Sequence, residues 1–242
     1  MIDDNINQFT YRDKKSFSDA GLIMYLPPKI IAPKREISFV TIPGRSGDII
    51  YSQKKFTNTQ ITYHAEIFKE NFDISAVARK VRAWLQTEIG YFNLSDTYNP
   101  DYFYRAAFEG GIDIEQEFLH TGKSPLAFNC KPFKYSLIGQ SPIIFTGAKT
   151  LANPEAWETK PYIKITGSGN ITLKINNASF TFKGIKDYIE VDSEMMSAYK
   201  ATELQNDKAY FDEFPILSPG TNNISFTGSV SQIEIIPRWC CL

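Results

Sequence analysis

The sequence at residues 42–51 is Ile42-Pro43-Gly44-Arg45-Ser46-Gly47-Asp48-Ile49-Ile50-Tyr51, a short polar connection between two apolar runs. Proline fixes φ at about −65° and glycine adopts the positive φ of tight turns, so Pro-Gly is a strong turn signal. The run that ends at Ile42 and the run that begins at Ile49 are therefore predicted to be two strands joined by this turn. Arg45 and Asp48 then project from a backbone held in a defined bend.

The sequence on both sides continues the strand pattern. Ile37 and Phe39 alternate with polar residues before the turn, and Ile49 begins the next strand. The clearest strand is predicted over residues 60–68, where one face carries Ile61, Tyr63, Ala65 and Ile67. A period of two residues is typical of a strand with one buried face.

The period changes to that of a helix over residues 73–87. Its apolar side chains recur three and four residues apart and share one helical face: Ile74, Val77, Ala78, Val81, Trp84 and Leu85. Asp73 or Ser75 is suited to cap the start of this helix, and Gly90 follows its end. Off the apolar face lie basic residues that are either solvated or part of a subunit contact: Arg79, Lys80 and Arg82.

A change of composition marks a domain boundary between Pro132 and Gly139. We expect an N-terminal domain over residues 1–137 and a C-terminal domain over residues 138–242. The last predicted strand of the first part covers residues 126–130. In the second part, short strands are predicted over residues 161–166, 171–175, 223–227 and 231–236, with closely spaced turns such as Asn176-Asn177. This pattern is typical of a sandwich or jelly roll. The predicted fold class is mainly β, with two β-sandwich domains and one α-helix in the first.

The charge balance narrows the classes of partner. With 26 basic and 27 acidic residues the net charge is −1 and no basic block is present, so specific nucleic-acid binding is not expected. The N-terminus lacks the features of a secretory signal, and no apolar run approaches the roughly 20 residues of a membrane span. We expect a soluble chain made in a cytosol, without membrane insertion, with Cys130, Cys240 and Cys241 as free thiols.

No catalytic signature stands out in the sequence. His64 and His120 are too few for a His-rich zinc site, and Gly167-Ser168-Gly169 is followed by a strand where a phosphate site needs a helix. Asp192 and Glu194 would share one strand face about 7 Å apart, a spacing compatible with an inverting glycosidase. Paired carboxylates at a strand end are nevertheless routine, and the structural interpretation of this pair is the stronger one.

Aromatic residues in the second part allow a sugar-binding interpretation. Trp157, Tyr162 and Tyr188 could form a platform, because aromatic faces stack on the apolar faces of other rings. Packing in the core or at a hinge is the other interpretation of these three side chains. Trp239 is expected to fill the core of the second domain, and Trp84 that of the first.

The connection at residues 42–48 also belongs to an ordered set of motifs. It follows Lys34-Arg35-Glu36, and further motifs come later in the chain: Trp84-Leu85, Asp101-Tyr102-Phe103-Tyr104-Arg105, Phe128-Asn129-Cys130-Lys131-Pro132, Pro161-Tyr162-Ile163-Lys164-Ile165-Thr166-Gly167, Phe214-Pro215-Ile216-Leu217-Ser218-Pro219-Gly220 and Pro237-Arg238-Trp239. The ordered set covers nearly the whole chain. It resembles the siphophage distal tail proteins (Dit), the tail-tip ring proteins of long-tailed phages.

The resemblance implies a structural hub of the virion tail tip, with no enzymatic activity and no cofactor. The N-terminal domain would form a closed homo-oligomeric ring, a hexamer in this family, and the C-terminal domain would be a galectin-like β-sandwich. The ring would join the tail tube protein to the tail spike protein or tail-associated lysin, with baseplate or receptor-binding proteins as further partners. The protein would be synthesised in the cytoplasm of a bacterial host. No sugar-binding insertion is visible, which favours a plain adaptor.

Arg45 and Asp48 are the first candidates for a functional role. They form either a turn-stabilising ion pair, worth under about 1 kcal/mol if exposed, or part of the ring interface, where charges fix orientation and register. The predicted ring interface consists of Arg45, Asp48, Arg79, Lys80 and Arg82. The alternatives are a monomeric carbohydrate-binding adhesin acting through residues 138–242 and a glycoside hydrolase that uses Asp192 and Glu194.

Overall fold

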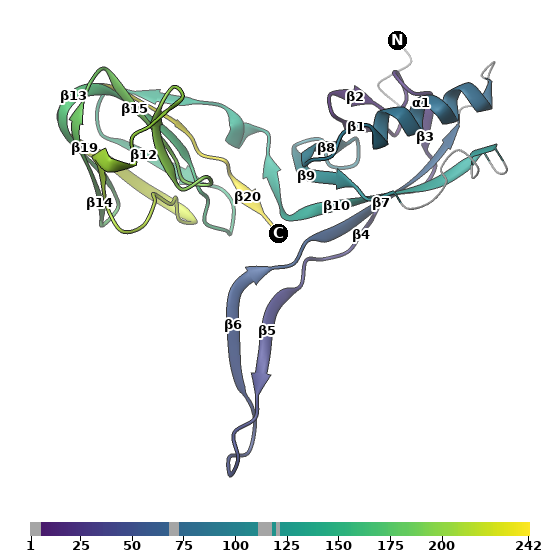
Figure 1. Cartoon of the computed structure of the whole chain (residues 1–242), viewed down its shortest axis with the longest axis horizontal. Helices are drawn as coiled ribbons and strands as arrows, with labels where there is room; N and C mark the ends of the chain where they lie inside the picture. Colours follow the sequence, from purple (N-terminus) through teal and green to yellow (C-terminus); the bar gives the residue numbers. More distant parts are fainter. Residues whose placement is uncertain (1–5, 68–72, 111–117, 120–121) are drawn as a thin grey trace. The chain divides into compact units, whose positions relative to one another are not determined.

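The computed structural model describes residues 6–67, 73–110, 118–119 and 122–242. The chain divides into two compact units: unit 1 comprises Met1–Lys134 with Leu242, and unit 2 comprises Tyr135–Cys241 (Figure 1). Among the residues described, strands dominate both units and one long α-helix lies in unit 1, so the predicted mainly β fold class is confirmed. His120 lies outside the described residues.

Unit 1 is a curled sheet with helix α1 packed against it. Its strands pair in the order β2-β1-β8-β9-β10-β7-β3, and β4 also pairs with β7. The bounds of these elements are Phe9–Tyr11 (β1), Lys14–Lys15 (β2), Leu22–Met24 (β3), Lys29–Ile30 (β4), Thr59–Ile67 (β7), Ile74–Gln86 (α1), Phe92–Asp96 (β8), Tyr102–Phe108 (β9) and Lys123–Ser136 (β10).

Strand β7 carries the alternating face that the sequence predicts. Its buried apolar side chains are at most 1% exposed: Ile61, Tyr63, Ala65 and Ile67. Strand β10 runs antiparallel to β7 with Phe128 opposite Ile61, so their buried faces coincide. His64 is half-buried on the other face with its ring against Tyr25, and its predicted place on the polar side of the strand is confirmed.

Helix α1 covers the core of unit 1 with the face that the sequence predicts. Its start is capped by Asp73, whose Oδ1 accepts hydrogen bonds from the backbone N–H of Ser75 at 2.9 Å and of Ala76 at 3.4 Å. Trp84 is 7% exposed and stacks on Phe9, with ring centroids 5.7 Å apart, so its predicted core position is confirmed. No helix in the described part of the chain is long and apolar enough to cross a membrane.

Strands β5 (Arg35–Val40) and β6 (Ile49–Phe56) form a separate two-stranded hairpin, which we call the β5–β6 hairpin. Phe39 pairs with Ile50 next to the connecting turn. Gly44 and Gly47 have φ angles of 81° and 84° in this turn, in the left-handed region that glycine reaches at no steric cost. The predicted strand–turn–strand is confirmed.

Unit 2 is a second curled sheet. Its strands pair in the order β11-β19-β13-β15-β16-β17, with β12 on β19, β14 on β13 and β18 on β14. The bounds are Ile143–Phe145 (β11), Lys149–Asn153 (β12), Tyr162–Ile175 (β13), Ala178–Ile185 (β14), Tyr188–Asp192 (β15), Ser197–Lys200 (β16), Glu203–Leu204 (β17), Ala209–Tyr210 (β18) and Gly220–Ile236 (β19), with 3-10 turns at Ile138–Gln140 (η2) and Asn206–Lys208 (η3). Strand β20 (Cys240–Cys241) is not part of this sheet and pairs with β10.

The curvature of unit 2 arises inside β13 and β19. The first half of β13 pairs with β15 and the second half with β14, while β19 follows it along both halves. The register shifts near Gly167, where a Cβ would lie 2.3 Å from the backbone oxygen of Ser229. Glycine therefore permits the close approach at which the strands bend, and one hydrogen-bonded sheet encloses a core.

Several strands are longer than the sequence predicts. Residues 161–166 and 171–175 are predicted as separate strands, but β13 runs through both. Residues 223–227 and 231–236 likewise belong to one strand, β19. Strand β10 continues past Pro132 to Ser136, where the prediction ended it at residue 130. These predictions were wrong because glycine and proline mark a bulge as well as a chain break, and local sequence does not separate the two.

Candidate interaction surfaces

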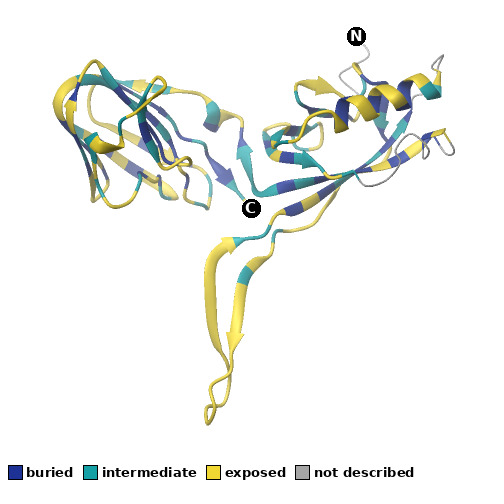
Figure 2. Cartoon of the chain, in the orientation of Figure 1, coloured by how far each residue is buried: buried dark blue, intermediate teal, exposed yellow. Residues whose placement is uncertain are grey.

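The β5–β6 hairpin exposes large apolar side chains close to its turn. Figure 2 shows the hairpin almost wholly in the colour of exposed residues. The exposed fractions are 39% for Ile37, 62% for Phe39, 48% for Val40, 39% for Ile42, 38% for Ile49, 62% for Ile50 and 61% for Tyr51. Within the described residues neither outer edge of this two-stranded sheet pairs with another strand. Large apolar side chains exposed close together on one hairpin are typical of a protein–protein contact.

The base of the hairpin is fixed by charged and aromatic side-chain contacts. The Arg35 guanidinium lies 4.6 Å from the centroid of the Phe56 ring, and Phe56 meets Phe133 edge to face at 5.9 Å. Lys55 Nζ and Glu36 Oε2 form an ion pair at 2.9 Å. Arg35 and Glu36 thus contact residues of the opposite strand at the base, whereas the half nearest the turn exposes apolar side chains.

The turn holds Arg45 and Asp48 as separate charges. Asp48 Oδ1 accepts a hydrogen bond from Thr41 Oγ1 at 2.7 Å, and the backbone N–H of Arg45 donates to the Ile42 carbonyl at 3.2 Å. No ion pair joins Arg45 to Asp48 in the described structure, so the interpretation as a turn-stabilising ion pair was wrong. Both side chains are exposed to solvent and to any partner.

The other three predicted ring-interface residues lie on the exposed face of α1. Arg79, Lys80 and Arg82 are all exposed, and Arg82 Nε donates a hydrogen bond to Gln86 Oε1 one turn later at 3.3 Å. The five predicted residues therefore form two groups, one at the hairpin turn and one on the helix (Figure 1).

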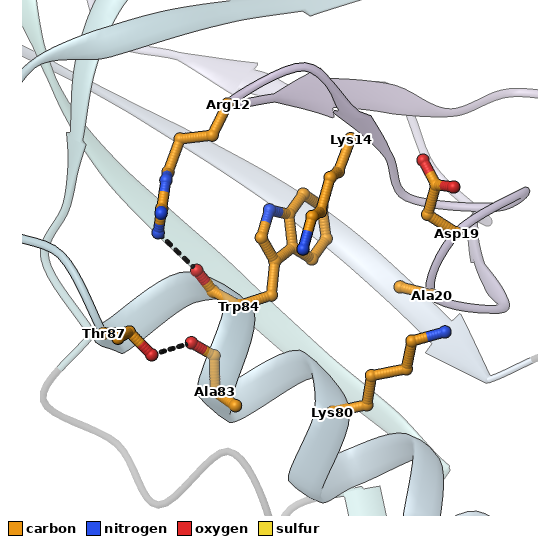
Figure 3. A pocket seen from close by; sticks show the side chains of 8 residues that line it. All are labelled: Arg12, Lys14, Asp19, Ala20, Lys80, Ala83, Trp84 and Thr87. Atoms are coloured by element: carbon orange, nitrogen blue, oxygen red, sulfur yellow. Dashed lines mark hydrogen bonds between the residues drawn. The ribbon is translucent and has the colours of Figure 1, made fainter.

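A pocket of about 320 Å³ opens between the end of α1 and the turn that joins β1 to β2 (Figure 3). Its lining comprises Arg12, Lys14, Asp19, Ala20, Lys80, Ala83, Trp84 and Thr87. Lys80 belongs to the predicted ring interface, but sequence reasoning missed Arg12 and Lys14. The sequence contains no signal for these two residues, because they approach Trp84 only in the folded chain. There the β1–β2 turn and α1, which are far apart in the sequence, lie on either side of the pocket.

The carboxylates Asp192 and Glu194 in unit 2 are engaged by Arg238. The Arg238 guanidinium donates to both oxygens of Asp192 at 2.8 Å and lies 3.6 Å from Glu194 Oε2. Burial raises the pKa of Asp192, but the hydrogen bonds and charge of Arg238 and the backbone N–H groups of Met195 and Glu194 together outweigh it, so this pKa lies below the ordinary value. A glycosidase acid needs a raised pKa, and a carboxylate held in a bidentate pair does not provide one.

Tyr162 and Tyr188, two of the three aromatic residues considered as a sugar platform, each contact polar or charged side chains of the sheet. Tyr162 donates its hydroxyl to Glu190 at 2.6 Å. The Tyr188 ring has the ammonium groups of Lys164 and Lys200 at 4.5 and 5.1 Å from its centroid. Tyr162 and Tyr188 also stand four positions apart along the β13–β15 ladder, which separates them by roughly 13 Å.

The cysteines carry no reactive or metal-binding arrangement in the part of the chain described. Cys130, Cys240 and Cys241 are free thiols, as expected. Burial raises the pKa of Cys130 and of Cys240 to about 12, so both stay protonated at neutral pH. Among the described residues no group of three or more His, Cys, Asp or Glu side chains could hold a metal ion.

Comparison with solved structures gives a strong likeness to a phage protein. No protein-family model matches the sequence, and no curated protein matches it either. The crystal structure of the phage SPP1 Dit (gp 19.1) protein superposes on the chain with a TM-score of 0.70. The match covers 95% of this chain and 98% of that one at 13% sequence identity. That protein is described as a paradigm of the hub adsorption apparatus in phages that infect Gram-positive bacteria. At this identity the likeness establishes the fold, and the chain has a Dit-like fold over nearly its whole length.

Proposed function

We propose that this protein is a structural hub of a phage tail tip. The observation that carries the proposal is the structural match to the SPP1 Dit protein over 95% of this chain. That protein is described as a paradigm of the hub adsorption apparatus. In this role the protein lies at the end of the virion tail after synthesis in the host cytoplasm. It joins the tail tube protein to the tail spike protein or tail-associated lysin, and baseplate or receptor-binding proteins attach to it. It acts as an adaptor that connects these proteins, and it does not catalyse a reaction.

The hub acts as a closed ring of copies, a hexamer, made through the β5–β6 hairpin. A ring from one kind of chain needs a heterologous contact, in which one surface of a copy meets a different surface of the next. The apolar half of the hairpin supplies one of these surfaces. Fully burying a Val, Leu, Ile or Phe side chain contributes about 1.5–3 kcal/mol, so several half-exposed side chains together support a stable contact.

The two groups of charged residues fit such a heterologous contact. Arg45 and Asp48 stand at the hairpin turn, and Arg79, Lys80 and Arg82 stand on α1, so one copy presents the first group and its neighbour presents the second. Charges in these places set the register and orientation of the contact more than its strength. The separation of the groups within one chain supports this arrangement, because a head-to-tail contact pairs different surfaces.

The test measures the mass of the full-length protein by light scattering coupled to size-exclusion chromatography over a series of concentrations. We expect a species with six times the chain mass, which Phe39→Asp combined with Ile50→Asp converts to monomer. The matched control is Ile144→Asp combined with Leu204→Asp, two residues of unit 2 that are 56% and 71% exposed. The control variant should keep the oligomer.

Negative-stain imaging extends the test to rings that assemble only with a neighbour. The protein is imaged alone and after co-expression with the presumptive tail-spike partner. Annular particles in either sample, absent from the Phe39→Asp, Ile50→Asp variant, support the ring. A protein that stays monomeric at high concentration and forms no annular particle with the spike partner contradicts it.

A further inference from the structure

The pocket between α1 and the β1–β2 turn is a built site with a fixed floor. Trp84 is held in place because its indole N–H donates to the Tyr11 carbonyl at 3.2 Å and its ring stacks on Phe9. Ala20 and Ala83 continue the apolar lining beside it. A volume of about 320 Å³ lies at the low end of the range for small-ligand sites, which suits a side chain with its nearest backbone.

Arg12 holds the wall of this pocket. Arg12 and Asp13 adopt φ angles of 54° and 59°, in the left-handed region, so the chain turns sharply between β1 and β2. The Arg12 side chain donates to the Trp84 carbonyl at 3.0 Å and forms an ion pair with Glu88. Its charge is therefore offset within the chain, and its role is to tie the turn to the last turn of the helix.

Lys14 and Lys80 reach the pocket from opposite walls without a partner (Figure 3). In the described structure neither ammonium group forms an ion pair or hydrogen bond. The one carboxylate in the lining, Asp19, accepts a hydrogen bond from the backbone N–H of Lys15 at 2.7 Å. The chain as a whole carries a net charge of −1, so this local excess of positive charge is not an average property of the surface.

We propose that this pocket binds a short acidic segment of a partner protein, with an apolar side chain against Trp84 and carboxylates at Lys14 and Lys80. An inorganic anion would leave the apolar floor unused. A nucleic acid needs a longer basic stripe than two lysines provide. An acidic segment with one apolar residue uses both features of the site. The partner surface goes beyond ring formation, although Lys80 also belongs to the proposed ring contact; Lys14, which does not, therefore carries the test.

The test uses the full-length protein and a fluorescein-labelled peptide, acetyl-Asp-Asp-Leu-Asp-Asp-amide, followed by fluorescence anisotropy at low and at physiological ionic strength. We expect Lys14→Glu to weaken binding about tenfold, because an attraction is replaced by a repulsion, and the Lys14→Glu, Lys80→Glu variant to weaken it further. The matched control is Lys29→Glu, an exposed lysine of the same unit outside the pocket, which should change binding less than about twofold.

Two further readouts separate recognition from a loss of structure. The Lys14→Glu, Lys80→Glu variant should bind acetyl-Lys-Lys-Leu-Lys-Lys-amide in place of the acidic peptide, and its melting temperature should move by no more than about 2 °C. A peptide with glycine in place of leucine should bind the wild type several-fold more weakly.

Four results would overturn the proposal. They are absence of peptide binding by the wild type, equal weakening by Lys29→Glu, equal binding of a short oligothymidylate, and loss of self-association by Lys14→Glu with unchanged peptide affinity. The last result would make a second copy of this chain the occupant. The ring proposal fails through the hairpin variants, so failure of the pocket and failure of the ring are distinguishable.

Discussion

Strand β7 and the β5–β6 hairpin both carry apolar side chains that alternate along the strand, but those of β7 are buried and those of the hairpin are exposed. Ile61 and Tyr63 in β7 are 0% exposed, whereas Phe39 and Ile50 in the hairpin are both 62% exposed. The face of β7 contributes to a core that also contains residues of β10 and α1, while the hairpin is a two-stranded sheet of its own. The period of two residues thus determines that a segment is a strand. Which surface covers the strand depends on other elements, and for the hairpin we propose that these belong to a neighbouring copy.

The same contrast holds for charged residues. Asp192 is 4% exposed and bound at both oxygens by Arg238, whereas Arg45 and Asp48 are exposed and do not pair with each other. Removing one partner of a buried pair destabilises its unit, because an uncompensated charge is left behind. Exposed charges at a turn contribute little to folding and are free to orient a partner.

The largest effect is expected from the buried alternation. Ile61→Ala removes side-chain atoms from a closed core and should lower the free energy of unfolding by about 2–5 kcal/mol. Urea denaturation of the full-length protein measures this loss. A loss under about 1 kcal/mol would mean that the β7 face is not the core of unit 1, and the comparison with the hairpin would fail.

The next effect tests the buried charge pair. Asp192→Asn should lower the free energy of unfolding at neutral pH by about 1–3 kcal/mol, because two charge-assisted hydrogen bonds are lost. Arg238 lowers the pKa of Asp192 in the folded state, so its stabilisation is present above the unfolded pKa of about 3.9 and is lost as pH falls through the lower folded value. Unfolding measured from neutral to acid pH should show the wild type and the variant converging below about pH 4.

Glu194→Gln is the matched control for that pair. Glu194 lies 3.6 Å from Arg238 and its side chain is 41% exposed, so its removal should cost under about 1 kcal/mol. Equal losses in the two variants would show that the bidentate geometry at Asp192 has no special role.

The elements that the sequence predicts well are those whose signals are local. Asp73 and the spacing of Val77, Val81 and Trp84 predict α1, and Pro43-Gly44 predicts the hairpin turn, because capping and turn preferences act within a few residues. The unusual features depend on distant chain segments. The exposure of Phe39 and the pocket around Trp84 each depend on what lies nearby in space, and a single sequence does not contain that information.

The strand lengths illustrate a second limit. Gly167 in β13 and Gly228 in β19 have the sequence signature of a break, yet both strands continue through a bend. A Cβ at Gly228 would lie 2.4 Å from the backbone oxygen of Asn170, so glycine is required there by close approach of β13 and β19. The candidate ring residues were placed correctly on exposed surfaces, but their assignment to an interface stays a prediction.

A smaller effect on folding is expected at the hairpin. Phe39→Ala should change the free energy of unfolding of the monomer by less than about 1 kcal/mol, since most of this ring is already in water. It should still weaken self-association, because the same ring is buried in the proposed contact. Urea denaturation and sedimentation velocity measure the two quantities separately. A large loss of monomer stability would show that the hairpin is covered within its own chain.

The smallest effect on folding is expected from Arg45→Glu. Arg45 is exposed and has no ion-pair partner in the described structure, so the melting temperature of the monomer should stay within about 2 °C of the wild type. At a ring contact the reversed charge meets groups arranged for the original one, and assembly should shift to higher protein concentration and become more sensitive to salt. Lys149→Glu, an exposed lysine of unit 2, is the control and should leave assembly unchanged. Two outcomes would contradict this prediction: Arg45→Glu changes melting and assembly equally, or Arg45→Glu and Lys149→Glu affect assembly equally. Either outcome would place the hairpin turn outside the contact, with its charges as ordinary solvated groups.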